Sequence, residues 1–252
     1  MSGHSKWSNI KHKKARSDEK RGKEFTKLAK EITIAARMGG GDPDSNARLK
    51  LTIQKAKALN IPNENITRAI KKGTGELDSE AFEELFYEGY ASGGVAVMLE
   101  IATDNRNRTA ADIRHLFAKH GGNLGETGCV SWMFDKVGLI SVDRENIENF
   151  DFDEFFLAAA EMGAEDVREE EDTLEIITAA DALMDIQERV SAEYPVISAE
   201  LIMMPQNMTE ISDEETAGKV LKLIDVLEDH DDVQNVFANF SIDDELLEKI
   251  NF

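Results

Sequence analysis

Apolar residues recur at helical spacing through the first 75 residues of the chain. The first stripe begins after Ser17 and reaches the glycines at 39–41, and Pro62 opens the last one. Because glycines commonly end helices and proline favours a first helical position, these residues mark helix boundaries. Residues 17–73 are therefore predicted to form a three-helix unit. The apolar positions of its stripes are Phe25, Leu28, Ile32, Ala35 and Ala36, then Leu49, Ile53, Ala56 and Leu59, then Ile66 and Ile70.

The pattern changes near residue 76, after a polar hinge with the sequence KKGTGELD. From there, short runs typical of strands alternate with helical stripes. We expect strands at 82–90, 94–102, 129–134, 137–142, 165–169, 173–178, 197–203 and 233–240, and helices at 107–120, 152–162, 181–193 and 213–229.

The order of these elements predicts that one domain is inserted in another. Residues 137–203 have the order strand, helix, strand, strand, helix, strand, which is ferredoxin-like. The elements on either side supply a second sheet that the first interrupts. The predicted fold class is α+β multidomain: an N-terminal three-helix domain followed by two ferredoxin-like α+β domains, one inserted in the other. The expected domains are residues 1–76, residues 77–135 with 205–252, and residues 136–204.

Charge is divided unevenly along the 252 residues, whose formal net charge is -21. Residues 1–75 hold 18 basic and 7 acidic side chains, a net charge of +11, which leaves 11 basic and 43 acidic side chains, or -32, in the remainder. Because salt screens charges over about 10 Å, the local field decides whether phosphates bind. The first 75 residues are therefore predicted to contact a nucleic acid, with an intramolecular contact to the acidic remainder as the main alternative.

The segment GHSKWSNIKHKKARSDEKRGK is the candidate nucleic-acid contact. Lysine and arginine bind phosphates, and tryptophan and histidine stack on unpaired bases. Trp7 could instead anchor this segment onto the helices. The candidate residues are His4, Lys6, Trp7, Lys11, His12, Lys13, Lys14, Arg16, Lys20, Arg21 and Lys23.

A second candidate is the motif TDNRNRT, where an expected strand ends and an expected helix begins. Asn107 or Asp104 would cap the helix, and the arginines with the exposed N–H groups would hold a phosphate or carboxylate. The alternative is a structural turn in which the arginines pair with the acidic surface. This secondary anion or partner site comprises Asn105, Arg106, Asn107, Arg108 and Thr109.

No residue pattern indicates catalysis, a metal or a cofactor. The single cysteine, Cys129, cannot build a thiolate metal site, and no phosphate-binding glycine motif or nucleophile–base set is present. The acidic runs VREEED and LEDHDD are interpreted as solvated edges and helix ends. No apolar stretch is long enough to span a membrane. We expect a cytoplasmic, non-enzymatic protein without a small-molecule substrate.

Several long motifs together resemble the YebC/PmpR family, which includes a mitochondrial translational activator. The motifs are GHSKWSNIKHKKARSDEKRGKEFTKLAKEI, GGGDPDSNARLKLTIQKAKALNIPNENITRAIKKGTGE, YEGYASGGVAVMLEIATDNRNRT and GGNLGETGCVSWMF. The resemblance covers essentially the whole chain and implies three domains, with one inserted in another. It also implies a probable transcriptional regulator that binds DNA, or a translation factor that binds ribosomal RNA on the ribosome and assists passage through proline-rich sequences.

Overall fold

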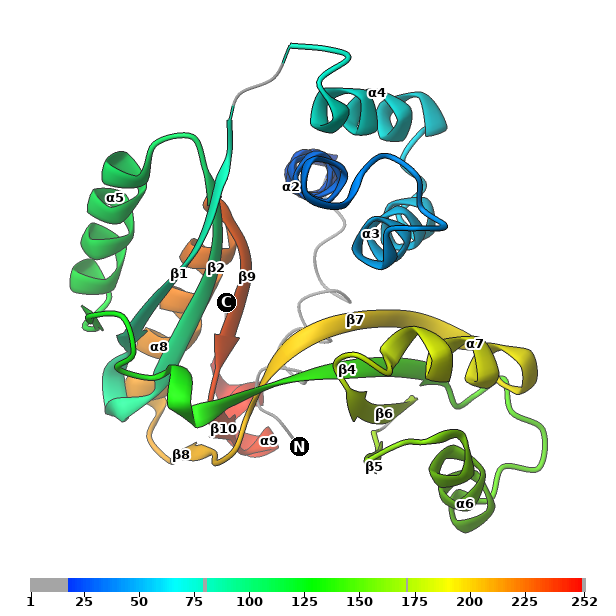
Figure 1. Ribbon diagram of the computed structural model, residues 1–252. Helices are drawn as coiled ribbons and strands as arrows, with labels where there is room; N and C mark the ends of the chain where they lie inside the picture. Colours follow the sequence, from blue (N-terminus) through cyan, green and yellow to red (C-terminus); the bar gives the residue numbers. More distant parts are fainter. Residues whose placement is uncertain (1–17, 79–80, 171, 251–252) are drawn as a thin grey trace. The chain divides into compact units, whose positions relative to one another are not determined.

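The computed structural model describes residues 18–78, 81–170 and 172–250, and Figure 1 labels most of its helices and strands. The chain divides into two compact units. One unit combines residues up to 134 with those from 205 onward, and the other consists of residues 135–204.

Three helices open the described part of the first unit: α2 (Asp18–Gly39), α3 (Ala47–Ala58) and α4 (Asn63–Thr74). Their apolar stripes meet in one core of buried side chains, including Leu28, Ile32, Leu49, Ala56 and Ile66. The backbones of α2 and α4 approach closely at Gly73, where an added Cβ would lie 2.4 Å from the Thr33 carbonyl oxygen. The expected three-helix arrangement is confirmed.

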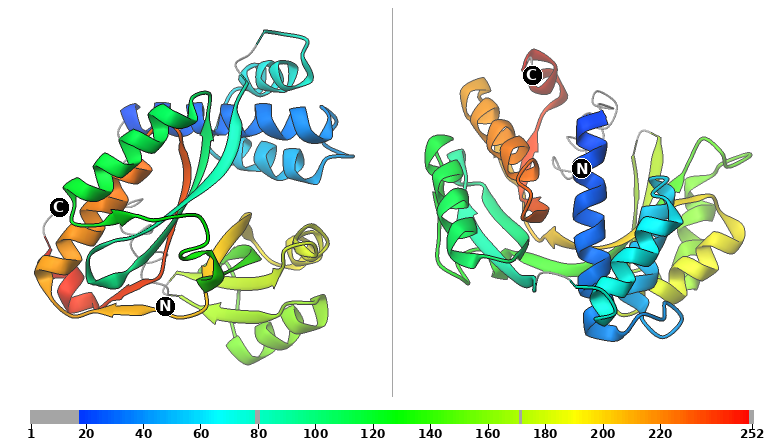
Figure 2. Two further views of the ribbon diagram at one scale, coloured as in Figure 1. Left: turned by 60° about the vertical axis from the view of Figure 1, so that its left-hand side comes forward. Right: turned by 90° about the horizontal axis from the view of Figure 1, so that it is seen from above.

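The sheet of the first unit is antiparallel and has the strand order β3-β1-β2-β9. Its strands are β1 (Glu83–Tyr90), β2 (Ala96–Thr103), β3 (Asn123–Leu124) and β9 (Val233–Ala238). Helices α5 (Arg106–Lys119) and α8 (Glu214–Glu228) lie side by side against it (Figure 2). Leu99 and Ile101 of β2 are fully buried in one core with Phe117 of α5 and Leu221 of α8.

Shorter elements complete this unit. Strands β8 (Thr209–Ile211) and β10 (Phe240–Ile242) pair in parallel, and α9 (Asp244–Lys249) follows them. Two single 3-10 turns occur at Ser92–Gly94 and Ser131–Met133. The sequence patterns did not predict these short elements.

The second unit has the predicted ferredoxin-like order of elements. It contains β4 (Phe134–Asp143), α6 (Phe152–Met162), β5 (Asp166–Glu169), β6 (Thr173–Ala179), α7 (Leu183–Glu193) and β7 (Val196–Pro205). The strand order is β5-β6-β4-β7, and β6 is antiparallel to both of its neighbours. Asp151 caps α6 by accepting a hydrogen bond from the Glu154 amide, and Gly163 ends the helix in the left-handed region. The α+β fold class is thus confirmed. In the first unit, two strands, β1 and β2, precede the helix α5 and the strand β3, so its chain order differs from the ferredoxin-like order of the second unit.

The strand predicted at 129–134 is wrong. Residues 131–133 form a 3-10 turn, and β4 begins only at Phe134. The amide groups of Val130 and Ser131 donate to the Glu88 carboxylate, so they are not available to a neighbouring strand.

Candidate nucleic-acid interface and its polar network

The predicted nucleic-acid contact falls largely outside the described residues. His4, Lys6, Trp7, Lys11, His12, Lys13, Lys14 and Arg16 all precede Asp18, where the structural description begins. Lys20 and Arg21 belong to the first turn of α2. Of the predicted set, Lys23 is the residue whose contacts can be followed.

Lys23 and two further lysines of α2 contact the carboxyl end of α8 and the residues that follow it. The Lys23 ammonium lies 3.5 Å from Asp229 Oδ2 and 3.4 Å from the Asp229 carbonyl oxygen. Lys27 donates to the carbonyl of Glu228, and Lys30 donates to the Asp231 carbonyl at 3.0 Å. Because the last carbonyls of a helix are unpaired and partly negative, lysines bind favourably there. This basic face of α2 is therefore used within the chain.

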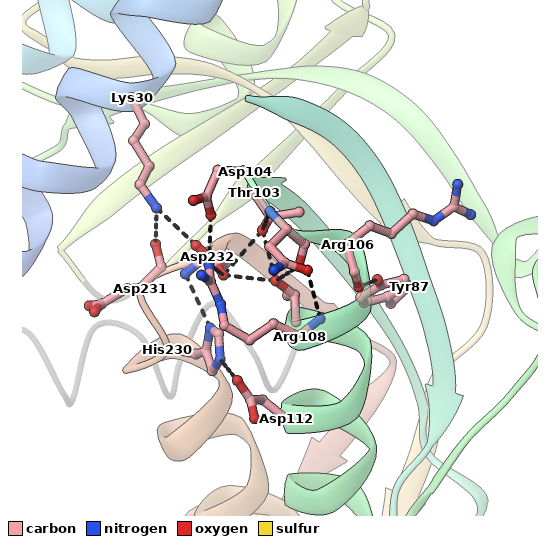
Figure 3. Close-up of polar contacts among 12 residues, drawn as sticks. Lys30, Tyr87, Thr103, Asp104, Arg106, Arg108, Asp112, His230, Asp231 and Asp232 are labelled. Atoms are coloured by element: carbon pink, nitrogen blue, oxygen red, sulfur yellow. Dashed lines mark hydrogen bonds and ion pairs between the residues drawn. The ribbon is translucent and has the colours of Figure 1, made fainter. Parts of the chain in front are cut away.

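Lys30 also reaches a buried carboxylate, that of Asp232, with Nζ 3.0 Å from Oδ1 (Figure 3). Asp232 is only 5% exposed. Its other oxygen accepts from Thr109 at 2.8 Å and from Arg108 at 3.2 Å, and Thr103 lies within hydrogen-bond distance at 3.3 Å. A buried carboxylate is stable only when such partners satisfy it. Asp232 thus joins α2, α5 and β2 at one point.

The ionisation of Asp232 follows from these contacts. Burial raises the pKa of its carboxyl, but the hydrogen bonds from Thr109 and Lys30, the positive charge of Lys30 and the hydrogen bond from Arg108 lower it. The lowering contributions prevail, so the pKa lies below its ordinary value of 3.8. The network therefore holds Asp232 as a carboxylate at neutral pH.

The motif TDNRNRT supplies much of this network. Asn105, rather than the expected Asn107 or Asp104, caps α5 by accepting from the Arg108 amide at 3.1 Å. The Asn105 amide donates to Thr103, whose hydroxyl lies 2.8 Å from that of Thr109. Asn105 and Thr109 therefore have structural roles.

The two arginines of the motif differ in their surroundings. Arg108 pairs with Asp104 at 2.6 Å and with Asp232, which matches the structural alternative for this motif. The Arg106 carbonyl accepts from the Tyr87 hydroxyl at 3.1 Å, and the Arg106 side chain points away from the network (Figure 3). Residues 104–108 are all exposed, but the side chains of Arg106 and Asn107 take no part in the network, so they are the ones available to a partner.

Sequence reasoning missed Lys30, His230 and Asp232. His230 accepts from the Asp232 amide through Nδ1 at 3.1 Å, and its Nε2 lies 3.9 Å from Asp112 of α5. The run LEDHDD was interpreted as a solvated edge, and for Asp232 that interpretation is wrong. No sequence signal distinguishes this aspartate from its exposed neighbours, because its burial depends on α2 and α5.

Glu88 of β1 forms a second buried carboxylate site, with donors from the loop before β4. It is 3% exposed and accepts 2.8 Å hydrogen bonds from the amides of Gly128, Val130 and Ser131. Burial raises the pKa of Glu88, but these backbone donors more than offset that effect and lower it. The loop presents Trp132, which is 65% exposed and whose indole N–H donates to the Cys129 carbonyl. The backbone around this tryptophan is thus fixed by internal hydrogen bonds.

Metal clusters and membrane-spanning helices are both absent from the residues that the structure describes. No group of three or more His, Cys, Asp or Glu side chains could hold a metal ion there. No helix among them is long and apolar enough to cross a membrane.

Comparisons with known proteins cover nearly the whole chain. Residues 5–76 match the family model described as the TACO1/YebC protein N-terminal domain, and residues 82–240 match that of the TACO1/YebC second and third domain. A protein of Syntrophomonas wolfei named probable transcriptional regulatory protein is 63% identical over 98% of this chain and 99% of its own length. One of Geobacter sulfurreducens with the same description is 55% identical over 99% and 100%. The crystal structure of a conserved hypothetical protein from Aquifex aeolicus is similar with a TM-score of 0.84 and 49% identity, covering 92% of this chain and 95% of that one.

Proposed function

Because the chain belongs to the TACO1/YebC family, we propose that it is a non-enzymatic, nucleic-acid-binding regulator of gene expression that acts as a DNA-binding transcriptional regulator in the cytoplasm. The observation that carries this proposal is the concentration of positive charge in residues 1–75, at +11, within a chain of net charge -21. Lysine and arginine side chains bind phosphates by releasing counterions, and this term dominates nucleic-acid affinity. The names of the relatives favour transcription.

The contacts of α2 indicate which lysines are available for phosphates. Lys27 binds the carbonyl oxygen of Glu228, the last residue of α8. Lys30 binds Asp232 beyond that end, and Lys23 lies beside Asp229. A lysine engaged in this way must break those contacts before it binds a phosphate. We therefore assign the main phosphate contacts to the basic residues that precede Lys23, with Trp7 and His4 stacking on bases.

We assign a secondary contact to Arg106 and Asn107. Both are exposed at the start of α5, whereas Arg108 is paired with Asp104 and Asp232. A guanidinium beside the amino end of a helix is suited to a phosphate or a carboxylate.

A second candidate function is translation, with the basic segment bound to ribosomal RNA. The charge of -32 on residues 76–252 favours it, because a long duplex repels so acidic a body while basic ribosomal proteins attract it. Lysines interleaved with Trp7 and histidines also suit folded RNA with exposed bases.

The assignment of the basic segment is tested by replacing Lys11, Lys13 and Lys14 with Glu. A matched control carries the same charge change at Lys50, Lys57 and Lys136, which are exposed. We expect the first variant to lose binding with its circular dichroism unchanged, and the control to retain most of its affinity. Equal affinities of the two variants would mean that total charge, and not this segment, governs binding.

Competition binding separates the two functions. The protein is titrated with promoter-length duplex DNA and with intact ribosomes at physiological salt. A preference of about 10³ or more for one duplex sequence supports a transcriptional regulator. Tight ribosome binding together with weak, sequence-independent DNA binding supports a translation factor and contradicts the first proposal.

A further inference from the structure

An open groove of about 810 Å³ lies between the carboxyl end of α5 and the first half of α8. It is at the opposite end of this helix pair from the Asp232 network, because α5 and α8 run in opposite directions. Lys119 and His120 line the groove from α5 and its cap, and Lys219 and Lys222 line it from α8. Gly121 and Gly218 also line it and add no side chain.

The groove concentrates positive charge in the acidic part of the chain. Residues 76–252 contain 11 basic side chains, and three of them line this groove. The pKa of His120 reflects this concentration of positive charge. Burial lowers the pKa of its imidazole, and so do the nearby charges of Lys119, Lys222 and His115. The charges that shift His120 are thus all cationic, although the surrounding sequence is strongly acidic.

Two glutamates line the groove against three lysines, so the lining keeps an excess of one positive charge. Glu215 pairs with Lys219 at 2.6 Å, while Glu214 is the other acidic residue in the lining. Lys222 lies 3.7 Å from Asp225, which is near the limit for an ion pair. Among the described residues, Lys119 has no ion-pair partner. Lys119, and Lys222 with its long ion pair, are therefore the cations that a ligand can engage, and both act on His120.

We propose that this groove binds a phosphate group through Lys119, His120 and Lys222. A shallow, open site lined by flexible ammonium groups fits a phosphate, which lysine binds as a compact point charge. The phosphate comes from a nucleic-acid backbone or from a free phosphate compound. In the first case this inference rests on the function proposed above and gives the chain a second nucleic-acid contact, outside the basic segment.

The direct test is a pH titration of His120 in the full-length protein, monitored by NMR. It is carried out in phosphate and in chloride at equal ionic strength. A bound phosphate favours the imidazolium, so we expect phosphate to raise the pKa of His120 toward or above its ordinary value of 6.5. In a Lys119→Gln/Lys222→Gln variant, the pKa is already higher in chloride, and the effect of phosphate disappears. A Lys136→Gln/Lys249→Gln variant serves as the matched control and should respond as the wild type does. Identical His120 titrations of the wild type in the two salts would overturn the proposal.

A second measurement identifies the source of the phosphate. Binding of a short single-stranded oligouridine is measured against salt concentration for the same variants. The slope of log K against log salt is negative. For a single strand, each phosphate that the protein no longer neutralises reduces the magnitude of this slope by about 0.7, so replacing both lysines should reduce it by about 1.4. An unchanged slope with a positive His120 result assigns the groove to a free phosphate compound.

The response of His120 to phosphate does not depend on nucleic-acid binding by the basic segment. If the Lys11, Lys13 and Lys14 variant loses nucleic-acid binding while His120 still responds to phosphate, both proposals stand. If the wild-type protein binds no nucleic acid but His120 responds, the proposed function fails and the phosphate site remains.

Discussion

Lys30 Nζ and Asp232 Oδ1 lie 3.0 Å apart although the two residues are 202 positions apart in the sequence. The two side chains are 15% and 7% exposed. Because Asp232 also binds Arg108 and Thr109 of α5, this ion pair ties the N-terminal helices to the sheet and its covering helix. The basic face of α2 thus stabilises the fold, whatever the residues before it bind.

Replacing Asp232 with Ala should strongly destabilise the first unit. Removing one partner of a buried ion pair leaves the other uncompensated, and this costs about 3–5 kcal/mol. Lys30→Met should cost less, about 1–3 kcal/mol, because Asp232 keeps its hydrogen bonds from Thr109 and Arg108. Urea denaturation measures both changes, with Lys50→Met at an exposed site as the control. An Asp232→Ala protein as stable as the wild type would contradict the role of this network.

Glu88 should make stability depend on pH in the acidic range. Its pKa is lowered from 4.5 in the folded chain, so the unfolded chain takes up the proton first as the pH falls. The stabilisation is complete above about pH 4.5 and disappears as the pH falls through the lower folded-state value.

A Glu88→Gln variant checks this dependence through thermal midpoints measured between neutral and acidic pH. The variant should be less stable by about 2 kcal/mol or more at neutral pH, because three backbone amides lose a charged acceptor. The difference from the wild type should shrink below about pH 4.5. Glu126→Gln, at an exposed position of the loop that donates to Glu88, should match the wild type throughout. A difference that stays constant into the acidic range would mean that the charge of Glu88 is not what matters.

Asn105 and Asn107 make a matched pair within one motif. Asn105 accepts from the Arg108 amide at the start of α5, whereas Asn107 is exposed in its first turn. Asn105→Ala should cost about 1 kcal/mol, as the removal of other N-caps does. Asn107→Ala should change stability by less than about 0.5 kcal/mol. Amide hydrogen exchange at Arg108 should accelerate only in Asn105→Ala, and acceleration in Asn107→Ala instead would show that the cap is misassigned.

Gly73 and Gly22 are both helical glycines with opposite expected responses to alanine. A Cβ at Gly73 would lie 2.4 Å from the Thr33 carbonyl oxygen and 2.7 Å from the Ala36 Cβ, whereas nothing lies within 4 Å of one at Gly22. Gly73→Ala should therefore destabilise the helices by about 1–3 kcal/mol through overpacking. Gly22→Ala should stabilise α2 by up to about 1 kcal/mol, because alanine is the better helix former. Denaturation midpoints give both signs, and a stabilised Gly73→Ala protein would refute the close approach of α2 and α4.

Local pattern was a reliable guide where one face of an element packs on a core. The stripe containing Leu28 and Ile32 predicted α2, and the pattern over residues 152–162 predicted α6 with the bounds that the structure has. The same reasoning failed at 129–134. Val130 and Phe134 are buried, but Trp132, which would share their face in a strand, is 65% exposed. There the Glu88 carboxylate takes the backbone N–H groups that a strand would need.

The sequence by itself determined the three helices, the ferredoxin-like order of the inserted unit and the basic character of the first 75 residues. These properties follow from periodicity, helix boundaries and composition, which are local. Only the tertiary structure decided that Asp232 is a buried partner of Lys30 while its neighbours in LEDHDD end a helix, and that Asn105 is the cap. It also decided that Lys119 and Lys222 line one groove. Burial and pairing depend on which distant segments pack together, and no spacing along the chain encodes that proximity.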